Sequence, residues 1–299
     1  GTGSIGSEIV RQLLATDVST IRIYSRDEHK QHELRQELGT DPRLTFLLGD
    51  VRDKDRLDFA FRDVDICFHA AALKHVPFCE YNPFEALKTN TIGTQNVIDV
   101  SIRNNLEKVI AISTDKAVSP ESVLGASKLM AERLIAAANL TVGRSRTRFA
   151  CVRFGNVIGS RGSVAHVWRH QIENGEPVTV THKRVSRFFM EVPESVNLIF
   201  DAMRLMHGGE IFVLKMKKHL IIDYARELIK KFGNGKKIAI TFTGLRPGEK
   251  IDEELFTKEE SAHMLETRSM YIITPQQLVP DYHYHPSSYP GSRKASVRR

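Results

Sequence analysis

Cysteine is scarce in this chain, with three residues among 299, and the three show no paired spacing. A disulfide framework or a zinc site is therefore not expected, and a reducing compartment, the cytoplasm, is. No uninterrupted apolar run approaches the ~20 residues that a membrane span needs, and no signal peptide is visible. A membrane segment, if the natural protein has one, is expected in an extension before residue 1.

Charge of one sign is not concentrated in the body of the chain. Lysine and arginine number 43 against 36 acidic residues, a net charge of +7. Because the basic residues are scattered, nucleic-acid binding is not expected. A small ligand that carries phosphate explains the same excess equally well.

Apolar runs typical of buried strands alternate with helical patterns along most of the chain. This alternation predicts an α/β fold of the Rossmann type, a doubly wound parallel sheet covered on both faces. Strands are expected at 21–24, 44–48, 65–69, 108–113, 148–153 and 210–214, and helices at 84–104, 127–138 and 193–206.

The domain organisation follows from where the alternation weakens, near residue 155. The dinucleotide-binding domain is expected to comprise residues 1–154 and about 188–216, and a smaller substrate-binding lobe residues 155–187 and 217–275. Residues 276–299 are rich in proline, serine, tyrosine and basic residues without periodicity, so we expect a poorly ordered tail.

The chain opens on a glycine loop that leads into a helical pattern. Glycines permit a tight turn and a close approach of backbone amides to a pyrophosphate, so the loop predicts dinucleotide binding. Such a loop normally follows the central strand of the sheet, and we expect that this first strand is missing from the chain. The loop residues predicted to bind the dinucleotide are Gly1, Gly3, Ser4, Ile5 and Gly6.

The residues after the strand expected at 21–24 bear on cofactor choice. Folds that prefer NAD usually place an acidic residue there, whereas this chain has Ser25 and Arg26, with Lys30 close behind. A guanidinium suits a 2′-phosphate, which favours NADP over NAD. Further contacts are expected at other strand ends: Asp50 and Val51 beside the adenine, and Ala70 and Ala71 beside the cofactor backbone.

The strand expected at 108–113 ends in Ser113-Thr114-Asp115-Lys116, and Lys128 follows twelve residues later. Together with its surroundings, this stretch of sequence resembles the extended short-chain dehydrogenases/reductases. More narrowly, it resembles the CapD-like nucleotide-sugar 4,6-dehydratases of polysaccharide biosynthesis. The matching text covers most of residues 1–275 and includes GTGSIGSEIV, HAAALKHVP, STDKAVSP, GASKLMAERL, RFGNVIGSRGSV and FTGLRPGEKIDEEL.

The resemblance implies an NADP-dependent UDP-N-acetylglucosamine 4,6-dehydratase that forms a homo-oligomer. It implies that Lys128 binds the nicotinamide ribose and that Thr114 contacts the sugar 4-hydroxyl. After hydride leaves C4, Lys116 would remove the C5 proton, which requires its neutral form. Asp115, when protonated, would protonate the departing C6 hydroxyl, and hydride would then return to C6.

The resemblance also implies a set of substrate contacts. A carboxylate at Glu249 suits the diol of the uridine ribose, because a diol donates well to a carboxylate. Lys74 is expected to reach the substrate phosphates or the sugar. The positions expected around the UDP moiety are Asn156, Arg161, Ser163, Arg187 and Arg246. No metal site is expected, because no cluster of His, Cys and Asp has ligand spacing.

One position departs from the fold's usual pattern. A tyrosine normally stands four residues before the lysine, and this chain has Leu124, which takes no proton. Thr114 acting through water, or Asp115, are the candidates for removing the 4-hydroxyl proton. Two other functions stay open: a nucleotide-sugar epimerase acting at C5 or C4, and a catalytically silent NADP-binding protein.

The first test concerns the cofactor. Arg26→Ala should weaken NADP binding by ~1.5–3 kcal/mol and NAD binding far less, because only NADP carries the 2′-phosphate. Titration of the purified protein with each cofactor measures both affinities. Equal weakening of the two would contradict the assignment of Arg26.

Overall fold

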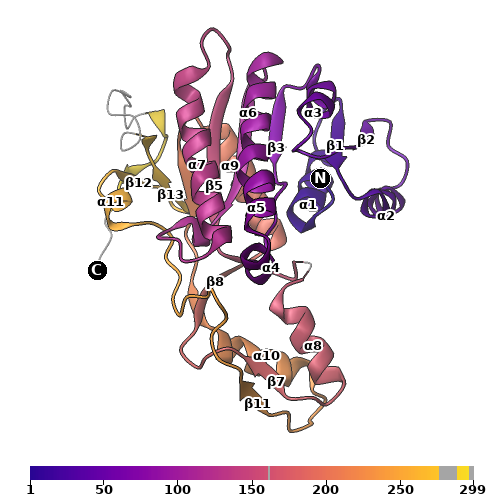
Figure 1. Ribbon diagram of the computed structural model, residues 1–299, viewed down its shortest axis with the longest axis vertical. Helices are drawn as coiled ribbons and strands as arrows, with labels where there is room; N and C mark the ends of the chain where they lie inside the picture. The colour runs from indigo at the N-terminus through magenta and orange to yellow at the C-terminus, as the bar shows by residue number, and fades with distance from the viewer. Residues whose placement is uncertain (161, 276–287, 296–299) are drawn as a thin grey trace.

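The computed structural model describes residues 1–160, 162–275 and 288–295. Its largest sheet has seven strands in the order β14-β12-β13-β9-β5-β4-β3 (Figure 1). Strands β3, β4, β5 and β9 are parallel, and β13, β12 and β14 each pair with a neighbour in antiparallel fashion. The expected α/β fold with a mainly parallel sheet is confirmed. The strands are β3 (Ile66–His69), β4 (Lys108–Thr114), β5 (Arg148–Phe154), β9 (Ile211–Leu214), β12 (Met264–Glu266), β13 (Met270–Ile273) and β14 (Arg293–Lys294).

Two further strands form a separate parallel pair, β1 (Ile21–Ser25) and β2 (Leu44–Leu48). Within the described residues, neither pairs with the seven-stranded sheet. Helix α1 (Ser4–Leu14) bridges the two sheets, because Ile9 packs in a core cluster of the large sheet and Val10 in the core beside β1. The glycine loop before α1 and the strand β1 that follows the helix are thereby attached to the main body.

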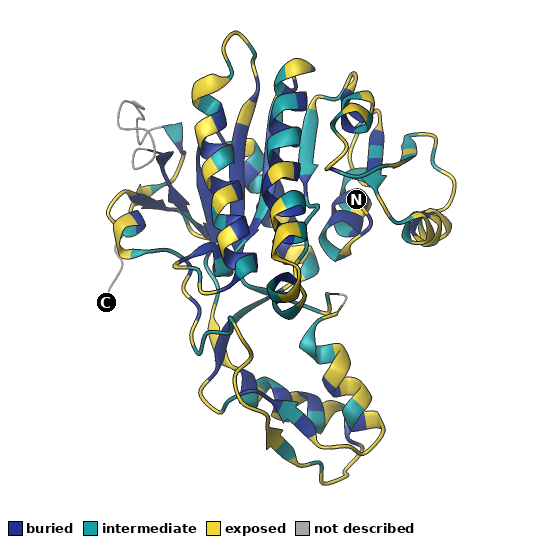
Figure 2. Ribbon diagram, viewed as in Figure 1, coloured by how far each residue is buried: buried dark blue, intermediate teal, exposed yellow. Residues whose placement is uncertain are grey.

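Helices cover both faces of the large sheet. Helices α6 (Gly93–Arg103) and α7 (Val123–Thr141) lie over one face in Figure 1, and α9 (Val192–Leu205) lies behind it. Two apolar clusters fill the spaces on either side, and the strands between them are mostly buried (Figure 2). Helix α7 begins where the Ser122 side chain accepts a hydrogen bond from the Gly125 amide.

The shorter helices differ in places from the sequence-based expectation. The single helix expected over 84–104 is divided into α5, a π-helical turn at Leu87–Ile92, and α6. Aspartates Asp27 and Asp53 cap α2 and α3, because each side chain accepts a hydrogen bond from an amide in the first turn. These elements are α2 (Glu28–Leu38), α3 (Lys54–Phe61), α4 (Val76–Tyr81), α5 (Pro83–Ala86) and a short 3₁₀ turn at Asp115–Ala117.

A smaller lobe lies below the carboxyl ends of the parallel strands in Figure 1. Its own core surrounds Trp168, whose indole donates to the carbonyl of Thr179 at 2.6 Å. A three-stranded sheet of order β10-β8-β6 leads into the lobe, and β7 and β11 form a parallel pair within it. The elements are β6 (Asn156–Ile158), α8 (Val164–Glu173), β7 (Val178–Val180), β8 (Ser186–Glu191), β10 (Lys218–Leu220), α10 (Ile221–Phe232) and β11 (Ile240–Phe242).

The segment expected to be a poorly ordered tail, residues 276–299, is in part a packed element. Tyr289 is 1% exposed, and its hydroxyl donates to the buried carboxylate of Glu210. Strand β14 pairs with β12 at the edge of the large sheet. The expectation was wrong for residues 288–295, because one buried aromatic ring and two strand residues anchor them without producing a period in the sequence. Residues 276–287 and 296–299 lie outside the described residues.

A buried ion-pair network joins three distant parts of the chain. The guanidinium of Arg153 on β5 contacts Glu132 of α7 at 2.7 Å and Glu260 at 2.9 Å. It also donates to the carbonyl of Leu255 at 3.0 Å. Glu260 lies in α11 (Lys258–Ser261), which Thr257 begins with a capping box. Burial by itself lowers the pKa of Arg153, but the two carboxylates outweigh burial and raise it.

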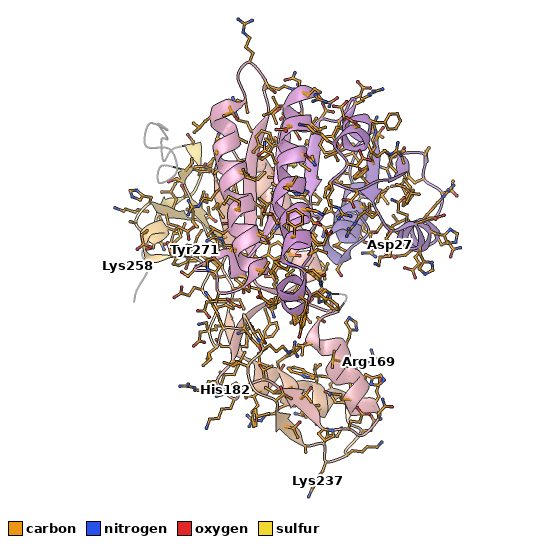
Figure 3. All side chains as sticks on the ribbon, in the orientation of Figure 1. Asp27, Arg169, His182, Lys237, Lys258 and Tyr271 are labelled. Atoms are coloured by element: carbon orange, nitrogen blue, oxygen red, sulfur yellow. The ribbon has the colours of Figure 1, made fainter. Side chains whose placement is uncertain are left out.

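This network should dominate the stability of the fold. Arg153→Met leaves two buried carboxylates without their cation and should lower the free energy of unfolding by about 3–5 kcal/mol. The matched control is Arg169→Ala, which removes an exposed ion pair with Glu173 on the outer side of the lobe (Figure 3) and should cost roughly 0.5 kcal/mol or less. Urea unfolding of both variants measures the difference. Similar losses in the free energy of unfolding would show that the network does not dominate the stability of the fold.

Candidate functional site

The glycine loop is built for a close backbone approach. A Cβ at Gly1 would lie 2.5 Å from Cγ2 of Ile23, and one at Gly6 would lie 2.6 Å from the carbonyl oxygen of Gly1. Gly3, the residue before α1, has open space where its Cβ would be, and no side chain caps the helix there. The N-terminus of α1 thus carries no side-chain cap, an arrangement that fits a pyrophosphate there. Ser4 and Ile5 form the first residues of that helix.

The residues predicted to select NADP gather at the carboxyl ends of β1 and β2. The Arg26 guanidinium lies 3.6 Å from the carboxylate of Asp50, and its side chain is about half exposed. Ser25 accepts a hydrogen bond from Thr2 of the glycine loop at 3.3 Å. Lys30 is 2.6 Å from Asp27, in an exposed ion pair on α2. The predicted residues Val51, Ala70 and Ala71 follow β2 and β3 on the same edge, Val51 being buried.

The predicted chemical residues form a hydrogen-bonded group at the end of β4. The Thr114 hydroxyl donates to Oδ1 of Asp115 at 2.9 Å, and Nζ of Lys116 donates to the same oxygen at 3.0 Å. Asp115 is completely buried, and its Oδ2 has no hydrogen-bond partner among the described residues. The carboxyl group therefore has one oxygen that is shared by two donors and one that is buried without a partner among the described residues.

A second carboxylate at Lys116 was not identified from the sequence. Oε1 of Glu253 lies 3.5 Å from Nζ of Lys116, and Glu253 is 3% exposed. Burial by itself lowers the pKa of Lys116, but Asp115 and Glu253 outweigh burial and raise it. The neutral amine that a base requires is thus not the resting form of Lys116. One signal for Glu253 was present: in an extended segment, it shares a face with the buried Leu255 two residues later.

Lys128 lies on α7, one turn after Leu124. Its Nζ donates to the carbonyl of Ile112 on β4, and burial lowers its pKa. Burial and the neighbouring Lys128 charge together lower the pKa of His69 to about 3, so His69 is neutral. Leu124 itself is 4% exposed and packs in an apolar cluster with Cys79 and Ala86. The position of the usual tyrosine is therefore filled by a core side chain.

The predicted substrate residues separate into two groups. Near the chemical residues, Oδ1 of Asn156 accepts from Nζ of Lys116 at 3.4 Å. Lys74 lies in the loop after β3, where burial lowers its pKa. Ser163 precedes α8, and its buried hydroxyl has no hydrogen-bond partner in the described part of the chain. Arg161 lies outside the described residues.

The second group surrounds Glu249 at the start of the segment that carries Glu253. The Glu249 carboxylate accepts from Thr181 at 3.0 Å, from Arg187 at 3.2 Å and from the Arg246 amide at 3.2 Å. Arg187 is buried, and it also donates hydrogen bonds to the backbone carbonyls of Ser186, Lys250 and Ile251. Its guanidinium thus fastens the segment to β8, a task that the sequence did not reveal. The phosphate contact predicted for Arg187 stays a prediction.

The described residues contain neither a cluster of metal ligands nor a membrane-spanning helix. Across 1–160, 162–275 and 288–295, no three His, Cys, Asp or Glu side chains are grouped as ligands of a metal ion. Over the same ranges, no helix combines the length and the apolar character that crossing a bilayer demands.

The sequence matches the family described as polysaccharide biosynthesis protein over residues 1–275. It is 51% identical over 280 residues to an uncharacterized membrane protein of Methanocaldococcus jannaschii, which covers 92% of this chain and 84% of that one. It is 42% identical over 277 residues to a Campylobacter jejuni protein named UDP-N-acetylglucosamine 4,6-dehydratase (inverting), covering 92% and 81%. A UDP-glucose 4-epimerase of Rickettsia bellii is 42% identical over 278 residues, covering 91% and 80%.

Solved structures with the same fold include the X-ray structure of Pen from Bacillus thuringiensis. It superimposes with a TM-score of 0.89 at 43% identity and covers 91% of this chain and 85% of that one.

Proposed function

Since the chain belongs to the polysaccharide biosynthesis protein family, we propose that it is an NADP-dependent nucleotide-sugar 4,6-dehydratase. It converts UDP-N-acetylglucosamine into a 4-keto-6-deoxy sugar nucleotide for surface polysaccharide. The observation that carries the proposal is the hydrogen-bonded group of Thr114, Asp115 and Lys116 at a strand end. A dehydratase needs an acid and a base side by side, and a carboxyl and an amine that share one hydrogen bond meet that need. The similarity to the Campylobacter jejuni dehydratase supports the same reaction.

The residues of the glycine loop fit a dinucleotide, which would accept hydride from C4 of the sugar and return it to C6. The N-terminus of α1, which no side chain caps, would hold the pyrophosphate. Arg26 would hold the 2′-phosphate of NADP, and its half-exposed guanidinium directly after β1 supports this role. Lys128, fixed by the Ile112 carbonyl, would hold the nicotinamide ribose.

The hydrogen bond from Thr114 to Asp115 supplies a path for the first proton. With Leu124 in the place of the usual tyrosine, the sugar 4-hydroxyl needs another acceptor. Thr114 takes that proton while donating its own to Asp115, at 2.9 Å. Asp115 thereby becomes the protonated acid that the next step requires, so the proton lost at C4 is the one that leaves with the C6 hydroxyl as water.

Lys116 performs the elimination in this scheme. The 4-keto group acidifies the C5 proton, and the neutral amine removes it while Asp115 protonates the leaving hydroxyl. Once hydride has returned to C6, the ammonium of Lys116 returns a proton to C5. The protons and the water balance over the whole cycle.

The lobe is proposed to bind the UDP moiety. Glu249 would accept from the uridine ribose, and Asn156, Ser163 and Arg246 would contact the phosphates or the sugar, with Lys74 reaching them from the loop after β3. In this division the β1–β2 pair and the adjoining seven-stranded sheet would hold the cofactor and the lobe would hold the nucleotide, so the reacting sugar would lie between them.

Epimerization at C4 or C5 is the second candidate, because the similar Rickettsia bellii protein is named UDP-glucose 4-epimerase. Incubation with UDP-N-acetylglucosamine in deuterated water separates the functions. A dehydratase gives a product lighter by one water, whereas a C5 epimerase gives deuterium gain without water loss. An inverted sugar with neither change indicates a C4 epimerase. NADP binding without any conversion would favour a silent cofactor-binding protein and overturn the proposal.

The role of Lys116 has its own test. Lys116→Ala should slow elimination by ~10²–10⁴-fold, because the base is lost, while C4 oxidation and binding of both ligands persist. Solvent deuterium exchange at C5 and release of water from C6 measure the step. Near-native rates for both would place the base elsewhere.

A further inference from the structure

Glu253 has no task in the scheme above, although it contacts the base. Its side chain is 3% exposed, and its Oε1 lies 3.5 Å from Nζ of Lys116. Its Oε2 is buried and has no hydrogen-bond partner within the described residues. A buried carboxylate oxygen without a donor is costly, so the contacts of Glu253 in this structure do not fully satisfy its side chain.

The backbone on both sides of Glu253 is anchored. Two residues before it, the Ile251 carbonyl accepts from the Ser186 amide at 2.9 Å. Two residues after it, the Leu255 carbonyl accepts from Arg153 at 3.0 Å. The carboxylate is therefore held against Lys116 by the lobe strand β8 and by the buried ion-pair network, not by a flexible loop.

The elimination step requires that Lys116 first lose a proton, and few groups can take it. The charged and polar groups that face its ammonium are Asp115, Asn156, Arg187 and Glu253. Asp115 must itself be protonated to act as the acid. The Asn156 amide is not a base, and Arg187 is a cation. Among these side chains, Glu253 is the acceptor that remains.

We propose that Glu253 takes the proton of Lys116 and so converts it into the base, an inference that rests on the proposed dehydration. The Nζ–H bond breaks, an O–H bond forms on Glu253, and the amine then takes the C5 proton. After the ammonium has returned that proton to C5, Glu253 gives its own proton back to the amine. Glu253 touches Lys116 and not the substrate, so it is a positioning residue that sets the charge of the base.

The test compares Glu253→Gln, Glu253→Asp and the wild type with UDP-N-acetylglucosamine and NADP between pH 7 and 9. The wild-type rate of C5 deuterium exchange should be flat, since the proton moves inside the group. Glu253→Gln should lose about 10²-fold at pH 7 and regain about tenfold per pH unit, because Lys116 must then lose its proton to solvent. KM should change little, and Glu253→Asp should keep a flat profile at a reduced rate. The exposed neighbour variant Glu254→Gln is the matched control and should behave as the wild type.

A readout without substrate accompanies the kinetics. In ¹⁵N-lysine-labelled protein, the Lys116 pKa should be lower in Glu253→Gln than in the wild type, because a nearby negative charge is removed. A slow Glu253→Gln with an unchanged pH profile would mean a structural role, and near-native activity would also overturn the inference. If Glu253→Gln does not fold, a wild-type exchange rate that rises with pH overturns it. A wild type that releases no water defeats the proposed function, and the inference with it.

Discussion

The guanidinium of Arg153 cannot lie in the core without both of its carboxylates, because an uncompensated buried charge costs several kcal/mol. Glu132 and Glu260 must therefore be in place together, one on α7 and one beyond the lobe. Strand β5, the helix that carries Lys128 and the segment that carries Glu253 are fixed relative to one another by this requirement. Apolar packing distributes its stabilisation over many contacts, so the loss of one contact matters little. The ion-pair network depends on Arg153, Glu132 and Glu260 alone.

The position of the site follows from that constraint. The group around Lys116 lies where β4 ends, and the segment from Glu249 to Leu255 closes over it from the lobe side. Arg187 fastens the same segment to β8 through backbone carbonyls and Glu249. Two buried arginines thus hold one extended segment at both ends, which gives its carboxylates a defined geometry without helical or sheet structure of their own.

Much of this organisation was predictable from local patterns, and some was not. The strands at β3, β4 and β5 were found because buried parallel strands form continuous apolar runs with helices between them. The group of Thr114, Asp115 and Lys116 was predicted because it is contiguous at a strand end and lies in sequence that resembles the dehydratase family. Glu253 was missed because its contact with Lys116 joins residues far apart in the chain. It also lies between Asp252 and Glu254, so the sequence does not distinguish it from its acidic neighbours.

The packing of residues 288–295 shows the same limit from another side. Tyr289 is anchored by Glu210, about eighty residues earlier, and strand β14 contributes only two residues to the sheet. Periodicity reports elements that are long enough to repeat, so short anchors of this kind leave no signal in composition. The π-helical turn that divides the helix expected over 84–104 was also not predicted. The pattern of apolar residues there does not distinguish an α-helix from an α-helix with one π-helical turn.

The distance along the chain between Arg153 and Glu260 also bears on how the protein is made. They are 107 residues apart, and a ribosome that adds roughly 5–20 residues per second needs about 5–20 s to cover that interval. During this time the residues of β5 have been synthesised, but of the two carboxylates that pair with Arg153 only Glu132 is present. Packing of β5 into the core before Glu260 is synthesised would bury an incompletely neutralised guanidinium, so we expect that β5 packs late. A chaperone that shields the unfinished sheet would act in that interval.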